Sequence, residues 1–167
     1  MSSLHAVTAI PNTPSLEQHA IQYEDHLIHQ ALDLLEHRIF KGGPAMQNPS
    51  AVFDYLRLQL AGEPSEIFAV LFLNSQHEVI AWEPVFTGTI DAVTVHPRVI
   101  AQRCLIHNAA AVILAHQHPS GYTEPSLADK LITQRLKVAL EMFDVRVLDH
   151  VVVGKSEPFS FAQAGLL

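Results

Sequence analysis

Apolar residues recur every three or four positions in the first third of the chain, and short, almost wholly apolar runs follow. The first pattern extends from Leu16 to Ile39 and predicts an amphipathic helix. Ser15 precedes this helix as a capping residue, and residues 41–44, which include two glycines and a proline, end it. The apolar stripe of the helix needs a surface to pack on, and we expect that surface to be the rest of the domain or a second copy of the chain in a homodimer.

The short apolar runs are rich in Val, Ile, Leu and Phe and predict β-strands. Strands are predicted for residues 67–73, 79–82, 89–95, 109–115 and 145–153, and the first two form a hairpin. Further helices are predicted to begin at Pro49, after the capping residue Asn48, and to cover residues 98–108 and 127–143. This order predicts an α/β fold of the α+β kind, in which helices flank a mixed sheet.

The composition is that of a soluble globular protein, with 49% hydrophobic and 16% charged residues over 167 positions. We divide the chain into an N-terminal tail with its amphipathic helix (1–47) and one domain (48–167). The formal net charge of -7 argues against a cationic surface for nucleic acid or anionic membranes along the whole sequence. The single cysteine, Cys104, excludes an internal disulfide and a Cys-rich zinc site.

The sequence predicts neither a secretory signal nor a membrane span. Its N-terminus lacks a basic stretch that leads into an apolar run, so we expect no secretory signal. No apolar run is long enough to span a bilayer, so we expect no membrane partner. Together with the lone cysteine, these features predict a cytoplasmic protein.

Two histidines, His116 and His118, follow the apolar run that predicts the strand 109–115. Residues two apart on an extended strand face the same way, so both imidazoles are expected on one face. After a Pro-Ser-Gly turn, Ser126 and Asp129 open the next helix, where Asp129 can return a carboxylate to the same point. Two imidazoles and a carboxylate are three metal ligands, which leaves a fourth position for water. The same Ser-x-x-Asp spacing also predicts a capping box, and the two interpretations are compatible.

The spacing His-x-His-x7-Ser-x2-Asp resembles the JAMM motif of the JAB/MPN-domain metalloproteases. The surrounding sequence resembles the bacterial RadC family from about Ser50 to the C-terminus. The segments that carry this resemblance are His-Gln-His-Pro-Ser-Gly at 116–121, Glu-Pro-Ser at 124–126, Gly-Thr at 88–89, Val-His-Pro-Arg at 95–98 and Val-Leu-Asp-His at 147–150. The resemblance implies the three-layer, cytidine-deaminase-like architecture of JAB/MPN domains. It also implies a short form of the family, because no helix-hairpin-helix region precedes Asn48.

The family resemblance also implies site residues. It implies that His116, His118 and Asp129 bind Zn²⁺, with water as the fourth ligand. It implies an upstream glutamate as general base, for which Glu66 matches the family position best and Glu83, which also ends a predicted strand, is the alternative. Ser126, besides capping the helix, is a candidate donor to the oxyanion that forms at a substrate carbonyl.

One position departs from the family motif, and a further histidine, His150, has more than one possible role. Gln117 replaces the usual asparagine, and its side chain is expected to point away from both histidines. His150, beside Asp149, is either a neighbour that supports the metal ligands, a fourth ligand, or a structural residue of the strand surface. The basic residues of the helix that follows the site, among them Arg135, form either a small phosphate-binding patch or a solvated face.

The complete set of ligands favours a zinc-dependent hydrolase of the metallopeptidase or isopeptidase type, with an unidentified peptide or isopeptide substrate. A DNA-associated protein, with a role in DNA repair or in a mobile element, is the first alternative. A non-catalytic module with structural zinc is the second, and His150 as a fourth ligand would favour it. A zinc deaminase is disfavoured, because Cys104 cannot supply a Cys-x-x-Cys pair.

Overall fold

The computed structural model describes residues 16–41, 45, 48–88 and 94–167. Its five-stranded sheet has the order β2-β1-β3-β4-β5, and only the β3–β4 pair is parallel, so the sheet is mixed. The strands are β1 (Ile67–Leu73), β2 (Val79–Thr87), β3 (Ala111–Gln117), β4 (Arg146–Val153) and β5 (Phe159–Ser160), and the helices are α1 (Leu16–Lys41), α2 (Pro49–Leu60), α3 (Pro97–His107) and α4 (Leu127–Glu141).

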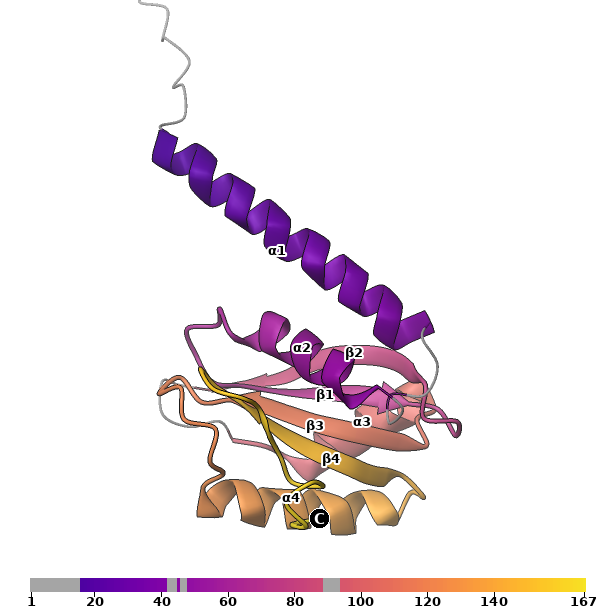
Figure 1. Ribbon diagram of the computed structural model, residues 1–167. Coiled ribbons are helices and arrows are strands. Elements are labelled where there is room, and N and C mark those ends of the chain that lie inside the picture. Colours follow the sequence, from indigo (N-terminus) through magenta and orange to yellow (C-terminus); the bar gives the residue numbers. More distant parts are fainter. Residues whose placement is uncertain (1–15, 42–44, 46–47, 89–93) are drawn as a thin grey trace, which may run out of the picture.

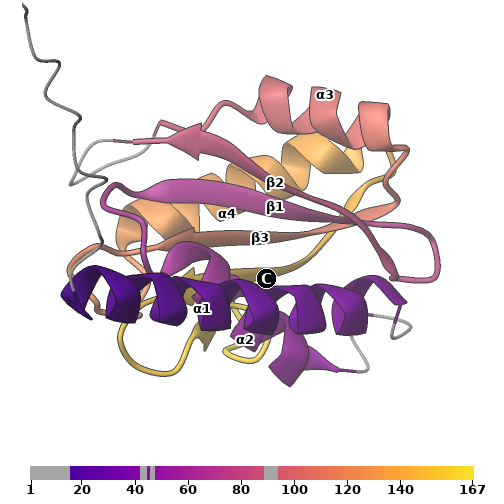
Figure 2. The same cartoon turned by 90° about the horizontal axis from the view of Figure 1, so that it is seen from above.

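The helices cover both faces of the sheet and make three layers. Figures 1 and 2 show α1 and α2 over one face and α3 and α4 over the other. Each face has its own core, because alternate residues of the buried strands point to opposite sides. Leu71 and Ile113 pack towards α2, whereas Phe72 and Leu114 pack towards α3 and α4. The predicted α/β fold and its three-layer architecture are therefore confirmed.

Most predicted elements lie within a few residues of their observed bounds. Asn48 caps α2 as expected, and its side chain accepts a hydrogen bond from the backbone of Ala51. β3 has the predicted length but lies two residues further along the chain and includes His116 and Gln117, because His116 still pairs with Phe68 of β1 and Gln117 with Val153 of β4. β2 is longer than predicted and ends at Thr87.

The strand predicted for residues 89–95 is the clear exception. Residues 89–93 lie outside the described residues, and Thr94 and Val95 are not part of a strand, so the prediction is wrong for these two. Val95 is buried in the core on the α3 and α4 side. Its β-branched side chain is thus used for packing, and Pro97 then starts α3.

Only the C-terminal part of α1 packs on the domain. Leu35 and Ile39 are buried in the core on the α2 side. Tyr23, Leu27 and Leu34 of the same stripe stay exposed, and Figure 1 shows the first turns of α1 leading away from the sheet. Packing on the domain is therefore confirmed for one end of the helix, and packing on a second copy stays a prediction.

The C-terminal segment returns to the sheet, as expected. Phe161 is fully buried, and its backbone N–H donates to the carbonyl of His150. Asp149 holds the segment through hydrogen bonds from Ser160 and from the backbone of Ala162. Burial raises the pKa of the Asp149 carboxyl despite these bonds. The segment thereby covers the strand that carries His150.

Within the described residues, no helix has the length and apolar character that crossing a membrane requires.

Candidate metal centre

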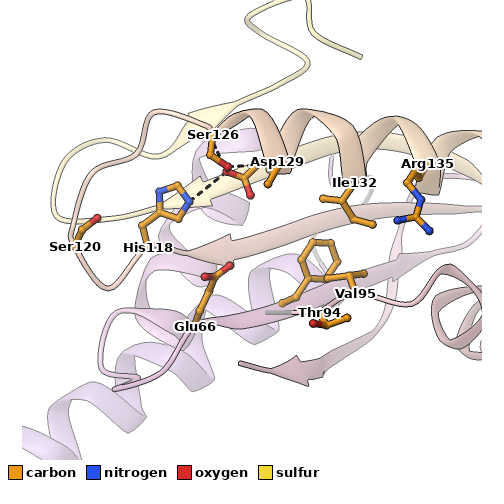
Figure 3. Close-up of a pocket in the computed structure, with 11 residues that line it drawn as sticks. Glu66, Thr94, Val95, His118, Ser120, Ser126, Asp129, Ile132 and Arg135 are labelled. Carbon is orange, nitrogen blue, oxygen red and sulfur yellow. Dashed lines mark hydrogen bonds and ion pairs between the residues drawn. The ribbon is translucent and has the colours of Figure 1, made fainter. Parts of the chain in front are cut away.

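The end of β3 and the start of α4 bring the three predicted ligands together. His116 Nε2 lies 3.0 Å from His118 Nε2 and 3.2 Å from Asp129 Oδ1. His118 Nε2 lies 3.4 Å from Asp129 Oδ2. The two histidines therefore share one face, as their spacing predicted, and Figure 3 shows His118 and Asp129 at one end of a cleft.

These separations fit a tetrahedral zinc ion. Zinc–nitrogen and zinc–oxygen bonds of roughly 2.0–2.2 Å place neighbouring tetrahedral ligand atoms about 3.3 Å apart. The three ligand atoms lie within 4.8 Å of one another. Among the described residues, His116, His118 and Asp129 form the one group of His, Cys, Asp or Glu side chains that could hold a metal ion. The donor set, two imidazoles and one carboxylate, is one that zinc uses with an open fourth position.

A chain of hydrogen bonds sets the tautomer of His116. The Thr133 hydroxyl lies 2.5 Å from the Asp129 carbonyl, which can only accept, so the hydroxyl proton is used there. His150 Nδ1, 2.6 Å from the same hydroxyl, must then carry a proton and donate it. His150 Nε2 therefore accepts from His116 Nδ1 at 2.8 Å, which leaves His116 Nε2 with a free lone pair that faces the other ligands.

His150 supports the site without being a ligand. It is fully buried, and this burial holds the pKa of its imidazole well below the ordinary value, so the ring is neutral. Phe161 stacks on the ring at a centroid distance of 4.8 Å, and Phe68 contacts it edge-on at 5.5 Å. Both ring nitrogens are used within the protein, so the hypothesis of a fourth ligand at His150 does not fit this geometry.

His118 is oriented by a second, separate hydrogen bond. Its Nδ1 donates to the carbonyl of Tyr122 at 2.8 Å, so its Nε2 also presents a lone pair to the site. In the protonated ring the same Nε2 donates to Asp129, and this hydrogen bond raises the pKa of the His118 imidazole. Burial alone would raise the pKa of Asp129, but hydrogen bonds from the protonated rings of His116 and His118 hold it well below the ordinary value. The group therefore favours positive charge at the point where its ligand atoms converge.

Ser126 and Asp129 form the predicted capping box at the start of α4. The Ser126 hydroxyl accepts from the Asp129 backbone at 3.1 Å and lies 2.6 Å from Asp129 Oδ2. The Ser126 backbone N–H donates to the same carboxylate oxygen at 2.7 Å. The hydroxyl proton is thus directed at the ligand carboxylate, and Ser126 orients Asp129. A role of Ser126 towards an oxyanion stays a prediction, and it requires this hydroxyl to turn.

Glu66, just before β1, lies in the cleft that contains Asp129 and His118. Its side chain is largely buried, and Figure 3 shows its carboxylate directed into the cleft. Burial raises the pKa of this carboxyl, although the nearby His116 and His118 oppose the change. A carboxylate with a raised pKa near the metal ligands is suited to proton transfer.

Gln117 explains how Glu66 is held. Its side chain points to the face opposite the histidines, as expected, and is buried. Its Oε1 accepts from the Ile67 backbone at 2.9 Å, and its Nε2 donates to the Ser65 carbonyl. These are the peptide groups on either side of Glu66. The side chain that departs from the family motif therefore fixes the backbone of the candidate base.

Glu83 lies elsewhere and is fully engaged. Arg103 donates to it through Nε at 2.6 Å and through a second guanidinium nitrogen, and His107 Nε2 lies 2.7 Å away. The hydrogen bonds from Arg103 are the main reason why the pKa of Glu83 is lowered. Glu83 does not line the cleft at the metal ligands. The geometry therefore favours Glu66 over Glu83 as the candidate base.

The cleft beside the ligands has a volume of about 520 Å³. Its walls come from β1, from the segment before α3, from the loop after β3 and from α4. The residues that line it are Glu66, Phe68, Thr94, Val95, His118, Ser120, Ser126, Ala128, Asp129, Ile132 and Arg135. It is large enough for a few residues of an extended chain.

Thr133 and the anchoring role of Gln117 are not among the site residues that the sequence predicted. Thr133 lies four residues after Asp129, so it shares a helix face with a predicted ligand, and this spacing could have identified it. Nothing in the local sequence connects Gln117 with Glu66, because Gln117 ends β3 whereas Glu66 precedes β1. Their contact depends on the antiparallel pairing of β1 with β3.

Comparison with known proteins identifies the family to which the chain is similar. The family model for the RadC-like JAB domain matches residues 46–166. A UPF0758 protein of Leptothrix cholodnii is 57% identical over 124 residues, which cover 74% of this chain and 56% of that protein. UPF0758 proteins of Pseudomonas fluorescens and Nitrosococcus oceani are each 54% identical, over 72% and 76% of this chain and 54% and 57% of their own lengths. The chain thus spans about half the length of these relatives, and α1 lies outside the family match.

Proposed function

The chain belongs to the RadC-like JAB domain family, and on this premise we propose that it is a zinc-dependent hydrolase that cleaves an amide bond in a peptide or isopeptide. One observation carries the proposal. Three convergent ligand atoms and a buried carboxylate that is not part of the ligand group lie in the same cleft. Metal-assisted amide hydrolysis needs this combination of an open metal position and a nearby base.

His116, His118 and Asp129 would hold the zinc ion. When bound, zinc lowers the pKa of a water to roughly 7 and polarises a carbonyl. Glu66 takes a proton from the attacking water and delivers it to the departing amine nitrogen. The burial that raises the pKa of Glu66 brings it closer to the pH at which such a transfer is efficient. Gln117 keeps this carboxylate in place through the two peptide groups that flank it.

The number of ligands supports a catalytic zinc ion over a purely structural one. Structural zinc sites are closed by four protein ligands. The candidate ligand group here has three members among the described residues, and the nearest further imidazole, His150, is engaged by His116 and Thr133. The remaining side of the group faces the cleft, where a substrate carbonyl can approach.

The proposal is tested by comparing two glutamate variants, Glu66→Gln and Glu83→Gln. Zinc content is measured by mass spectrometry, and hydrolysis is measured with an internally quenched peptide library and with isopeptide-linked peptides. We expect about one zinc per chain in the parent protein and in both variants. Loss of the general base should lower kcat by about 10²- to 10⁴-fold in Glu66→Gln. Glu83→Gln, the matched control, should keep its kcat.

Two results would contradict the proposal. Purified protein that takes up no zinc would remove the metal centre. Full hydrolysis by Glu66→Gln would remove the base.

A further inference from the structure

The cleft continues from the metal ligands along one face of α4. Ala128, Ile132 and Arg135 are spaced as i, i+4 and i+7, so they form one row on the helix. All three line the cleft, and Phe68 and Val95 line it as well. Figure 3 shows Ile132 between Asp129 and Arg135, with Arg135 at the end away from Glu66 and His118. The cleft therefore has an acidic, metal-binding end, an apolar middle and a cationic far end.

The length of this row matches a short peptide. Asp129 and Arg135 are six positions apart, which is about 9 Å along a helix axis at 1.5 Å per residue. An extended chain advances roughly 3.3 Å per residue, so this distance corresponds to about three substrate residues. A substrate whose scissile amide lies at the metal ligands would therefore bring a side chain or chain end to Arg135.

The guanidinium of Arg135 is exposed and makes no hydrogen bond or ion pair with the described residues. Arg103 differs, because Glu83 occupies its guanidinium. The carboxylates that line the cleft, Glu66 and Asp129, both lie at the metal end. An unpaired arginine in a binding cleft of a chain with a formal net charge of -7 is suited to a carboxylate, which it can bind with two parallel hydrogen bonds.

We propose that Arg135 forms a subsite for a substrate carboxylate about three residues from the scissile amide. This inference rests on the proposed function and adds a substrate class to it, namely an extended peptide with an acidic group at that distance. The apolar middle of the cleft, at Phe68, Val95 and Ile132, takes the residues between the amide and the acid. The carboxylate comes either from an acidic side chain or from a chain terminus.

The test scans one charge through a peptide series. Each fluorescent nonapeptide has otherwise uncharged side chains and carries one Asp or one Asn, which is moved from peptide to peptide through the positions on either side of the cleaved bond. Each peptide is made with a free and with an amidated C-terminus. We expect the protein to prefer Asp over Asn about tenfold in kcat/KM at one position about three residues from the bond. A preference for the free over the amidated terminus would identify a chain end as the source of the carboxylate.

Variants assign this preference to Arg135. Arg135→Gln should lose the preference through a higher KM, with kcat within twofold, and Arg135→Glu should prefer Lys at the same position. Lys137→Gln is the matched control, since Lys137 lies on the same helix and does not line this cleft. An unchanged preference for Asp in Arg135→Gln would overturn the proposal.

A binding arm separates this proposal from the proposed function. The affinity of the Asp peptides is measured by fluorescence anisotropy with zinc-loaded Glu66→Gln protein, with and without Arg135→Gln. Weaker binding on loss of Arg135 supports the subsite even where the parent protein hydrolyses nothing, and that combination would contradict only the hydrolase. Binding of a single-stranded oligonucleotide that depends on Arg135, without binding of the acidic peptides, would overturn the proposal in favour of a nucleic-acid ligand.

Discussion

Glu66 and Glu83 lie on or beside neighbouring strands, and their surroundings differ in what balances their charge. Glu83 is paired with Arg103 and His107, both of which α3 supplies, and its pKa is lowered. Glu66 lies in the cleft beside the candidate metal ligands, and burial raises its pKa. One carboxylate is thus neutralised within the protein, whereas the other remains available for proton transfer.

The side chains around the two glutamates differ in the same way, in whether they include a cation. The Glu83 cluster contains its own permanent cation, the Arg103 guanidinium. The group of His116, His118 and Asp129 presents two imidazole nitrogens and a carboxylate to one point, and those imidazoles are oriented by hydrogen bonds on their other nitrogens. A cluster with an internal cation contributes to stability, and a cluster of convergent lone pairs is suited to binding a metal from outside.

The largest expected effect is on metal content. His118→Ala removes one of the three ligands, and we expect the zinc content to fall from about one per chain to near zero after dialysis, as measured by mass spectrometry. His118 lies just after β3 and is only partly buried, so the fold should survive, which circular dichroism checks. Glu83→Ala, the variant of the other cluster, should keep its zinc. Retention of zinc by His118→Ala would show that the convergent group is not the binding site.

The next effect concerns the orientation of His116. Thr133→Val removes the hydroxyl that accepts from His150, and with it the constraint on the tautomer of the ligand imidazole. Removal of such a supporting partner typically lowers metal affinity by about 10- to 100-fold. Competition with a chelator measures this affinity.

Thr133→Ser supplies the matched control for this position. It keeps the hydroxyl and should restore most of the zinc affinity, whereas a role of Thr133 in packing alone would be met better by valine. Equal zinc affinities of the Val and Ser variants would contradict the proposed orienting role.

The smallest effect is on stability at the Glu83 cluster. Because the pKa of Glu83 is lowered in the folded state, its contribution is full above the ordinary glutamate value of about 4.3 and is lost as the pH falls through the lowered pKa. Glu83→Gln should lower the free energy of unfolding by about 1 kcal/mol at pH 7, since the pair is partly exposed and screened. Urea denaturation at pH 7 and at pH 3 measures the difference, which should shrink at pH 3. A constant difference at both pH values would indicate that the charge of Glu83 is not its cause.

The sequence by itself identified the three candidate ligands and the layers of the fold. His116 and His118 share a face because a strand repeats every two residues, and Asp129 returns to them through a turn and a capping box that Ser126 starts. All of this lies within 14 residues, where local geometry decides which side chains meet. The apolar runs and amphipathic patterns likewise predicted a buried sheet between helices, since burial follows the period of each element.

Only the tertiary structure showed which contacts Glu66, Glu83, His150 and Gln117 make. Both glutamates are polar residues beside apolar runs, so the local pattern does not separate them, and the preference for Glu66 came from the family resemblance. The antiparallel register that pairs Phe68 with His116 brings the beginning of β1 to the end of β3, where the ligands lie. The parallel pairing of β3 with β4 brings His150 beside His116 in the same way. These contacts join residues 34 to 52 positions apart, and strand pairing, which local pattern does not specify, decides them.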